Sequence, residues 1–523
     1  RPDFAEVHNN LGIVHGTLGQ MDEAQAQFER ALALAPDLAD AANNLATVLR
    51  AKGELAAAEA RYRQAIELRP DFAEAHSNLG SILQEQGKFD EAVACLRQAI
   101  ELRPSFAEAH NNLGNALRGQ GNLDEAVKQF EQALAIQPQY AEAHYNLGLV
   151  FWHQDQLDQA VARFEQAVAL RPDYAEPLNN LGVALREQLR LTEARQVFER
   201  LGALVPDGPH AQLGLGICDL IEGNYERGWP AYEARLRMPG QPPRPNLPRW
   251  TGEPLAGRSL LLLAEQGLGD TFQFVRYARL LKERGARVVL ACPPVLGRLM
   301  ASLHDLDGLF ILGSADELPR CDFYLPLLSA PGALGTTVAT IPHDVPYLTA
   351  DAELTKQWRW ELATPRGFKI AIAWQGSQKF LSDRRRSIPL AEFAPLARLP
   401  GVRLISLQKG FGSEQIAAVD FPVLDLSDRL DEAAGPFMDT AAIIRSVDLV
   451  VAADTAIAHL AGALGAQVWM ALQFSADWRW LLGRDDSPWY PTMQLFRQTK
   501  LSQWTDVFDR IAVAVEARRP ETD

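Results

Sequence analysis

The chain has 523 residues, and since a single hydrophobic core stops growing at roughly 250–300 residues, at least two folding units are expected. The net charge is −15 and no basic run is longer than residues 384–386, which argues against nucleic acid or an anionic membrane as the main partner. The four cysteines are dispersed without a CxxC pair, no apolar stretch of about 20 residues lacks charge and no signal peptide is evident, so we expect a cytoplasmic protein with no metal site, no disulfide framework and no membrane span.

A period of 34 residues runs through the first part of the chain. Asn-Leu followed by Gly or Ala recurs at this spacing, beginning at Asn10, Asn44, Asn78, Asn112, Asn146 and Asn180. Leu11 and Gly12 let the first helix of a repeat approach its neighbour closely, and Pro36 ends the second helix. This period and this residue pattern are typical of tetratricopeptide repeats, which stack pairs of helices into an α-solenoid.

The repeats weaken toward the middle of the chain. Six good repeats fill residues 5–208, and the chain opens inside a repeat, so further repeats are expected upstream. In a seventh repeat Gly228 replaces the recurrent small Ala and Trp229 adds bulk, as expected for a cap or a docking surface for the next domain. The expected boundaries are a repeat array at 1–242 and a Pro-rich linker at 243–258.

Two polar patterns of the array suggest a binding groove. The asparagines at the Asn10-type positions fall on one face of successive helices, and we call this row the Asn ladder. It is suited to hydrogen-bonding the backbone of an extended peptide, such as a protein acceptor, or to bridging adjacent repeats. Acids also recur at Glu6, Asp40, Glu74, Glu108, Glu142 and Glu176, which favours either helix-dipole compensation or an acidic groove. Oligomerisation through the repeats is a further possibility, and the recurrent histidines are interpreted as packing residues.

From Ser259 onward short apolar strands alternate with helices, which predicts parallel α/β sheets. Strands are expected at residues 260–264, 288–290, 370–374, 402–407, 448–452 and 468–472. Helices are expected at residues 270–284, 295–303, 390–399, 439–446, 456–464 and 505–518. The pattern predicts two Rossmann-like lobes, at 259–350 and 367–523, joined by a connection at 351–366. Ligands of such sheets bind beyond the carboxyl ends of the strands, where the strand order switches.

The first candidate loop, Glu-Gln-Gly-Leu-Gly-Asp at residues 265–270, follows a buried strand directly. Its two glycines allow a substrate to approach closely. Asp270 opens a helix, where an Asp normally keeps a low pKa, so it would act as a base only with a substrate hydroxyl held close. The alternative is that Asp270 is only an N-cap.

A second loop carries residues suited to a phosphate. Gly376 and Ser377 follow the strand expected at 370–374, and Arg384 and Arg386 come shortly after them. Arginines beside a glycine loop suit a pyrophosphate, because guanidinium groups bind phosphate oxygens in pairs. A solvated run of charge is the alternative.

A third loop, at residues 454–462, closes a strand and opens a helix. Thr455 and the neighbouring backbone N–H groups are therefore expected to form an anion site. His459 lies one turn inside the helix, and its spacing from Asp454 favours a ligand-binding role over a role in the core.

The C-terminal half resembles glycosyltransferase family nine, the ADP-heptose:lipopolysaccharide heptosyltransferases. The resemblance lies in Asp454-Thr455-Ala456, followed after two further residues by His459-Leu460-Ala461, and in Gly269-Asp270, where the Asp of that family is the proposed base. Ala456 departs from the family's Gly, which would crowd a phosphate there. Repeats followed by Glu-Gln-Gly-Leu-Gly-Asp and by Asp-Trp-Arg-Trp-Leu-Leu-Gly-Arg at 477–484 also resemble bacterial tetratricopeptide glycosyltransferase-like proteins.

The resemblance implies a GT-B fold and a metal-independent, inverting transfer from a nucleotide-sugar donor, with no cofactor. Asp270 would be the base, and the donor-binding candidates are Gly376, Ser377, Arg384, Arg386, Gln408, Asp454, Thr455 and His459. Asp477, Trp478 and Trp480 are expected to pack between lobes or to line the cleft. The alternatives are a non-catalytic scaffold with a degenerate GT-B domain and, less naturally, a sugar-nucleotide epimerase; sugar, nucleotide and acceptor stay undefined.

Overall fold

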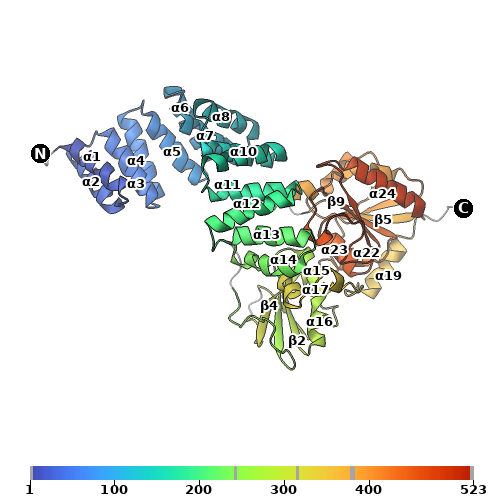
Figure 1. Ribbon diagram of the computed structural model, residues 1–523. Coiled ribbons are helices and arrows are strands. Elements are labelled where there is room, and N and C mark those ends of the chain that lie inside the picture. The colour runs from blue at the N-terminus through green and yellow to red at the C-terminus, as the bar shows by residue number, and fades with distance from the viewer. Residues whose placement is uncertain (1–3, 241–243, 314–316, 377–382, 519–523) are drawn as a thin grey trace. The chain divides into compact units, whose positions relative to one another are not determined.

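The computed structural model describes residues 4–240, 244–313, 317–376 and 383–518. Its internal contacts divide the chain into two compact units, Arg1–Pro206 and Asp207–Asp523, and each unit is described by itself (Figure 1). None of the described helices is both long and apolar enough to cross a membrane.

The first unit is a stack of helical pairs, as the 34-residue period predicts (Figure 1). Its helices are α1 (Ala5–Thr17), α2 (Met21–Leu34), α3 (Ala39–Ala51), α4 (Leu55–Leu68), α5 (Ala73–Glu85), α6 (Phe89–Leu102), α7 (Ala107–Gly119), α8 (Leu123–Ile136), α9 (Ala141–His153), α10 (Leu157–Leu170), α11 (Ala175–Glu187) and α12 (Leu191–Leu204). The core repeats too: Phe164 is fully buried, and a Cβ added to Gly148 would lie 2.6 Å from its ring. Gly is therefore required where the two helices of this pair cross.

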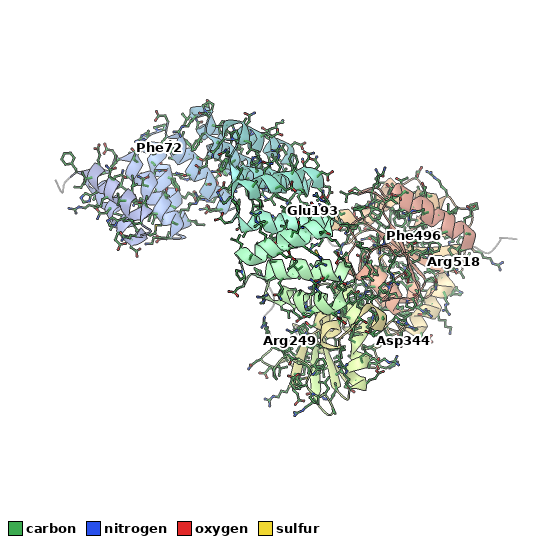
Figure 2. The ribbon with its side chains drawn as sticks, viewed as in Figure 1. Phe72, Glu193, Arg249, Asp344, Phe496 and Arg518 are labelled. Carbon is green, nitrogen blue, oxygen red and sulfur yellow. The ribbon has the colours of Figure 1, made fainter. Side chains whose placement is uncertain are left out.

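Charged side chains tie the repeats together on the outside of this core. The arginine that follows a second helix pairs with the acid at the start of the first helix of the same repeat, as Arg69 does with Asp40 and Arg103 with Glu74. The same guanidinium of Arg69 also lies 4.4 Å from the ring centre of Phe72, which belongs to the following repeat (Figure 2). Three of the recurrent acids, Asp40, Glu74 and Glu142, are thus ion-paired rather than free to form an acidic groove.

The second unit opens with a helical pair and continues into a small parallel sheet. Strand order is β3-β2-β1-β4, and β4 lies on the opposite side of β1 from β2, so the order switches beside β1. Its elements are α13 (Pro209–Ile221), α14 (Tyr225–Tyr232), η1 (Glu233–Arg237), β1 (Ser259–Leu263), α15 (Leu268–Phe274), α16 (Tyr277–Glu283), β2 (Arg287–Cys292), α17 (Pro294–Met300), β3 (Gly308–Ile311), β4 (Phe323–Pro326), η2 (Leu327–Ser329), α18 (Ala330–Ala333) and η3 (Val338–Thr340).

The rest of the unit forms a second parallel sheet, with the order β10-β9-β8-β5-β6-β7. Its elements are α19 (Ala352–Glu361), β5 (Phe368–Ala373), α20 (Asp383–Arg386), η4 (Leu390–Phe393), α21 (Ala394–Ala397), β6 (Val402–Ser406), η5 (Ser413–Ala418), β7 (Val423–Leu424), α22 (Met438–Ile444), β8 (Leu449–Ala453), α23 (Ala456–Ala463), β9 (Val468–Leu472), η6 (Trp478–Trp480), β10 (Met493–Arg497) and α24 (Thr505–Arg518). The core of this lobe combines Ile, Leu and Val side chains with aromatic pairs. Phe393 lies 4.4 Å from Phe508, and Phe496 lies 5.4 Å from Trp469, between ring centres. Strand order switches between β5 and β8, so the loops after these strands form the expected binding edge.

Several expectations need correction. The helix expected at 270–284 begins at Leu268 and breaks between Phe274 and Tyr277, because Arg276 turns its guanidinium onto the carbonyl of Gln273 instead of facing solvent. The connection expected at 351–366 is largely helix α19, and the sequence pattern did not reveal the short strands β3, β4, β7 and β10.

The boundary after the repeats also differs from the expected position at 242. The compact second unit begins at Asp207, so the seventh helical pair, α13 and α14, belongs with the sheets. The reason is aromatic packing: Trp229 of α14 donates from its indole N–H to the carbonyl of Thr336 at 2.8 Å and lies edge-on to Trp478 at 5.2 Å. The degenerate repeat is therefore a docking element of the α/β unit.

Candidate active site between the two lobes

Two helices from different lobes meet at the candidate site. Helix α15, which follows β1, packs directly on α23, which follows β8. A Cβ added to Gly269 would lie 2.9 Å from the ring of His459 and 3.4 Å from the Cα of Ala456. Gly269 thus admits protein atoms from the other lobe, and not a substrate as the sequence suggested.

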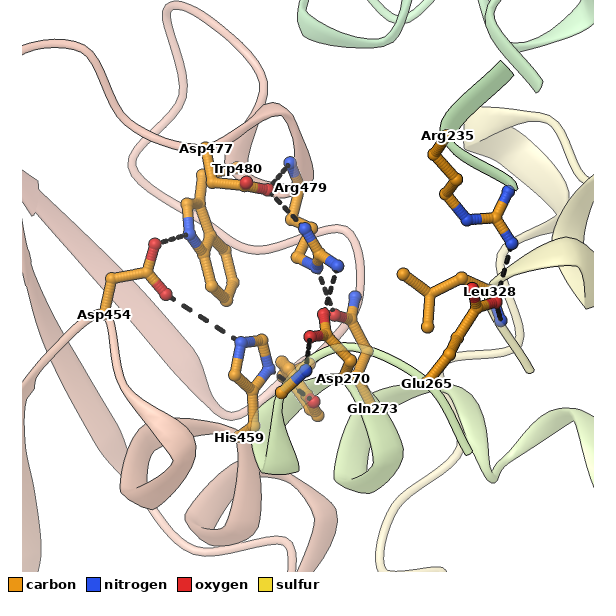
Figure 3. A network of polar contacts seen from close by, with 12 residues as sticks. Arg235, Glu265, Asp270, Gln273, Leu328, Asp454, His459, Asp477, Arg479 and Trp480 are labelled. Carbon is orange, nitrogen blue, oxygen red and sulfur yellow. Dashed lines mark hydrogen bonds and ion pairs between the residues drawn. The ribbon is translucent and has the colours of Figure 1, made fainter. Parts of the chain in front are cut away.

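Asp270 lies at this contact and has two partners (Figure 3). Its Oδ2 accepts the backbone N–H of Gly267 at 2.7 Å, and its Oδ1 accepts from the guanidinium of Arg479 at 2.5 Å. Arg479 also donates to Asp477 at 2.7 Å and to the side-chain oxygen of Gln273 at 2.8 Å. The N-cap of this helix is Gly267 and not Asp270, which is the third helical residue. The Asp270 carboxylate completes a capping box by accepting the Gly267 N–H, and it is also ion-paired with Arg479 across the lobe boundary.

The third candidate loop supplies the other half of the cluster (Figure 3). The Asp454 carboxylate accepts the indole N–H of Trp480 at 2.8 Å, and its other oxygen lies 3.8 Å from Nε2 of His459. The His459 ring stacks on Trp480 with 5.4 Å between centres, and its Nδ1 lies 3.0 Å from the hydroxyl of Tyr490. His459 is therefore held by partners on three sides.

Burial decides the protonation of this cluster. It raises the pKa of Asp270 above its usual range, against the opposing charge of Arg479, so the expectation of a low pKa was wrong. Burial and the neighbouring Asp477 raise the pKa of Asp454 to about 6. Burial, helped by Arg479, holds the pKa of His459 well below its usual range, so the imidazole is neutral at pH 7. The site combines a neutral imidazole with carboxyl groups that accept protons more readily than exposed ones.

The loop that leads to Asp270 is held by a buried ion pair (Figure 3). Glu265 accepts from the guanidinium of Arg235 at 2.6 Å and from the backbone N–H of Leu328 at 3.1 Å. Arg235 comes from η1, directly after the seventh helical pair, and is 3% exposed. Glu265 is therefore a positioning residue that joins the β1 loop to the helical pair and to the end of β4.

The expected donor-binding residues have different surroundings. Thr455 precedes α23, and its hydroxyl is buried with no hydrogen-bond partner. The positive charge of Arg386 opposes the rise in the pKa of both Asp270 and Asp454, so Arg386 lies near the cluster. Ser377 and the side chain of Arg384 lie outside the described residues.

Gln408 and Gly376 belong to the neighbouring β5–β6 edge. The Gln408 carbonyl oxygen accepts the backbone N–H groups of Trp374 and Gln375, and its amide donates to the carbonyls of Gln375 and Phe411. Its side chain is thus fully used in bracing the loop that carries Gly376, which is half-buried. Gln408 shapes this edge rather than offering its amide to a ligand.

The Asn ladder bridges adjacent repeats. Asn44 donates to Asn9 at 3.0 Å, Asn78 to Asn43 at 3.1 Å, and Asn146 to Asn111 at 3.0 Å. The remaining members are Asn10, which is exposed, Asn112, and Asn180, which donates to the hydroxyl of Tyr145. Bridging uses one amide proton of each donor, so the second proton and the accessible edge of the ladder stay available to a peptide.

Other recurrent residues serve the repeats locally. His110 contacts Gln129 and the carbonyl of Pro104, and His144 contacts the carbonyl of Pro138, at 2.9–3.1 Å. These contacts agree with the interpretation of the histidines as packing residues. Among the described residues no group of three or more His, Cys, Asp or Glu side chains has an arrangement suited to a metal ion.

Sequence reasoning missed Arg479, the most connected side chain of the cluster. It lies inside the motif at 477–484 and is 6% exposed, between Trp478 and Trp480. An arginine between two tryptophans and next to an Asp was a usable signal, because a buried guanidinium needs carboxylates and accepts aromatic faces. Asp477, Trp478 and Trp480 were expected to pack between lobes or to line the cleft. Trp478 packs on Phe274 of the first lobe, with 6.3 Å between ring centres, and Trp480 stacks on His459.

The described geometry defines a class of protein: a tetratricopeptide-repeat array joined to a unit of two parallel α/β sheets with a polar cluster between them. Tetratricopeptide-repeat models match residues 3–71 and, in overlapping segments, residues 77–141, 113–175 and 145–209. The chain therefore carries tetratricopeptide repeats.

The comparisons also found similar proteins. Protein FlbA of Caulobacter vibrioides is 27% identical over 333 residues, which are 57% of this chain and 53% of FlbA, so the chain spans about half of that relative. Among solved structures, PilW, a type IV pilus biogenesis factor, is 23% identical with a TM-score of 0.39, over 40% of this chain and 98% of PilW. YrrB, described as a tetratricopeptide-repeat protein with an unusual peptide-binding site, is 24% identical with a TM-score of 0.29, over 34% of this chain and 91% of YrrB.

Proposed function

We propose that the second unit is a GT-B glycosyltransferase that moves a sugar from a nucleotide-sugar donor to an acceptor, and that the repeats bind a protein acceptor. One observation carries the proposal. Asp270, Asp454, His459 and Arg479 come from segments that follow β1, β8 and β9, and they meet where α15 of one lobe packs on α23 of the other. Parallel sheets of this kind bind ligands beyond the carboxyl ends of their strands.

The proposed reaction assigns each group one task. Asp270 removes the proton of the acceptor hydroxyl as its oxygen attacks the anomeric carbon, and the bond from that carbon to the diphosphate oxygen breaks. The leaving nucleotide carries the negative charge, which Arg386 and the backbone N–H groups at the start of α23 offset without a metal. Attack from the side opposite the leaving group inverts the anomeric carbon. The raised pKa of Asp270 supports its role, because a base works best when its pKa approaches the working pH.

A second candidate function rests on the packing of α15 against α23. With Gly269 on His459 and the Thr455 hydroxyl buried, a donor would reach the start of α23 only after these helices separate. The second candidate is therefore a scaffold that binds protein through its repeats. In such a scaffold α15 and α23 would stay in contact and no donor would bind.

A thermal-shift screen against ADP-, UDP-, GDP- and CMP-sugars distinguishes the two. A donor that binds only the folded chain stabilises it by about 2.7 kcal/mol at a hundredfold excess over its Kd, which raises Tm by a few degrees. We expect one nucleotide class to do so, and we expect Thr455→Val to reduce the shift. If every nucleotide sugar at millimolar concentration leaves Tm unchanged, the transferase proposal fails and the scaffold function stands.

A further inference from the structure

The first helices of the repeats line the inner side of the array. Successive first helices contact one another, as α5 does α7 and α7 does α9, whereas successive second helices make no comparable contact. In a curved stack the elements on the inside are the closer set. Side chains that point away from the core on the first helices therefore face the concave surface.

The bridging of the Asn ladder fails at α7. Where the other partners of the ladder are mostly asparagine, the chain has Ser77, whose hydroxyl is buried without a hydrogen-bond partner. Asn112, which would bridge to this position, accepts weakly from Asn111 at 3.5 Å and donates to no described residue. The amide of Asn112 is thus half-buried with its N–H groups unused.

Arg118 lies near the end of α7, three residues after Asn115 and seven after Asn111, which puts it on the face of the helix that carries these two asparagines. It donates to the side-chain oxygen of Asn115 at 3.2 Å, its Nε is buried without a partner, and no carboxylate among the described residues pairs with it. The equivalent Arg50 is different, because it pairs with Glu85, 35 residues later. At the matching position after Arg118 the chain has His153, so the expected carboxylate is missing.

Tyr145 of α9 completes the group. It occupies a ladder-partner position where neighbouring repeats have asparagine, and its hydroxyl accepts from Asn180 at 3.0 Å. The ring is fixed between Phe164 and Tyr174, with centres 5.9 and 5.5 Å away. The charges of Glu176 and of Arg118 both act on this hydroxyl, so both side chains are near it, and the hydroxyl proton has no hydrogen-bond acceptor among the described residues.

We propose that Asn112, Arg118 and Tyr145 form an anchoring site for an extended peptide that carries an Asp or Glu side chain. Arg118 and the Tyr145 hydroxyl bind the carboxylate, and Asn112 donates to the peptide backbone. Arg118 lies about 9 Å beyond Asn112 along the axis of α7. This rise corresponds to about three residues of an extended peptide that runs along the helix. The inference rests on the proposed role of the repeats in binding protein, and it is independent of glycosyl transfer.

The selectivity follows from charge. A half-buried guanidinium without a counter-charge favours a carboxylate over a neutral side chain. The peptide carboxylate would neutralise Arg118 as Glu85 neutralises Arg50. The rest of the ladder contacts peptide backbone without reading side chains, so the carboxylate sets the register of the bound segment.

Peptide selection on the full-length protein tests the site. A random twelve-residue phage library is selected on the immobilised chain, and the most enriched peptide is synthesised with a fluorescent label. We expect an Asp or Glu at one fixed position, and we expect its replacement by Gln or Asn to weaken binding at least tenfold. Arg118→Gln should cause the same loss, and the peptide change should then have almost no further effect.

The matched control is Arg50→Gln, at the equivalent position where the arginine already has Glu85 as its partner. It should leave the peptide affinity within twofold, and thermal melting should show that both variants are folded. The proposal is overturned if no peptide is enriched, if the enriched peptides share no acidic position, or if Arg118→Gln binds like the wild type. None of these results depends on a nucleotide sugar, so they leave the transferase proposal to its own test.

Discussion

At the scale of single residues, the chemistry of the site depends on how Arg479 divides its hydrogen bonds. It holds Asp270 on one side and Asp477 on the other; the side chains of Arg479 and Asp270 are largely buried, whereas that of Asp477 is 38% exposed. An ionised carboxylate has about four acceptor positions, so Asp270 can serve Gly267 and Arg479 and still accept from a substrate hydroxyl. Asp477 makes a comparable ion pair with Arg479 without helping to cap α15.

This symmetry provides a matched pair of variants. Asp270→Asn and Asp477→Asn each leave Arg479 with one carboxylate, so both should lower stability, by about 1–3 kcal/mol. If Asp270 is the base, only Asp270→Asn should remove most of the transfer while donor binding persists. Denaturant melts and single-turnover transfer of a labelled sugar measure both effects. Equal transfer by the two variants would leave Asp270 with a structural role only.

Asp454 should make stability depend on pH in a defined direction. Its pKa of about 6 in the folded protein exceeds the usual 3.8, so the fold favours the protonated form. This group's stabilising contribution is full below about pH 4 and is lost as pH rises through 6, by up to about 3 kcal/mol. Asp454→Asn does not titrate, so its Tm relative to wild type should rise between pH 4 and pH 6.5. A Tm difference that is flat or falls over this range would contradict the burial argument.

The sequence predicted the separate loops of the site but not the contacts between them. Asp270, Asp454 and His459 were each found because they follow an apolar strand, a local pattern. Arg479 was missed because its partners are about 200 residues away, and only the packing of α15 on α23 brings them together. Gln408 was a donor-binding candidate, but its side-chain amide is occupied by backbone groups of the neighbouring loops, which the sequence did not reveal.

At the scale of elements, the 34-residue period fixed the helices of the first unit because each repeat contacts mainly its neighbours. In the second unit, long apolar strands such as β9 and long helices such as α24 were predicted to the residue. The short strands β3, β7 and β10 were not, because a few residues with interrupted apolar character carry no periodic signal. They are defined by pairing with strands that were already recognised.

The seventh helical pair differs from the others in what it packs against. Tyr225, Trp229 and Tyr232 surround Trp478, which also lies against Phe274 of the first lobe. The pair thus contacts both lobes, and Arg235 just after it anchors the β1 loop. Its departure from the repeat pattern, noted in the sequence as added bulk, is explained by these contacts.

A truncation series should therefore depend on where the chain starts. A protein that begins at Asp207 should fold cooperatively. One that begins at residue 243 should not, because it lacks the aromatic side chains that cover Trp478 and leaves this ring exposed. In the full chain, Trp229→Ala should destabilise the second unit by about 3–5 kcal/mol, as expected for a large side chain removed from a core. Calorimetry and near-ultraviolet circular dichroism follow both effects. A stable, cooperative protein from residue 243 onward would show that the pair is dispensable.

At the scale of the whole molecule, two units with separate cores imply two binding events that are separable by mutation. The anchoring site of the repeats is built from α7 and α9, and the polar cluster is built from segments after β1, β8 and β9. No side chain is shared between them. A change in the repeats that keeps them folded should alter acceptor binding and leave donor chemistry intact.

The Asn ladder allows such a change to be chosen with care. Asn44, Asn78 and Asn146 each bridge to a preceding asparagine, so replacing them removes inter-repeat bonds, each contributing about 0.5–1.5 kcal/mol to stability. Asn112 donates to no described residue, so Asn112→Ala should leave the melting temperature nearly unchanged. Replacing four bridging asparagines is informative only after the variant has been shown to be folded.

The double variant Asn112→Ala with Arg118→Gln therefore tests whether acceptor binding by the repeats is separate from the chemistry of the second unit. We expect it to slow sugar transfer to a protein acceptor at least tenfold, mainly through KM, because the anchoring contacts are lost while the base is untouched. Hydrolysis of the nucleotide sugar, which needs only water as acceptor, should proceed at the wild-type rate, whereas Asp270→Asn should slow both reactions. If the double variant slowed hydrolysis and transfer equally, the repeats would act on the α/β unit itself. If it slowed neither, the protein acceptor would bind elsewhere on the chain.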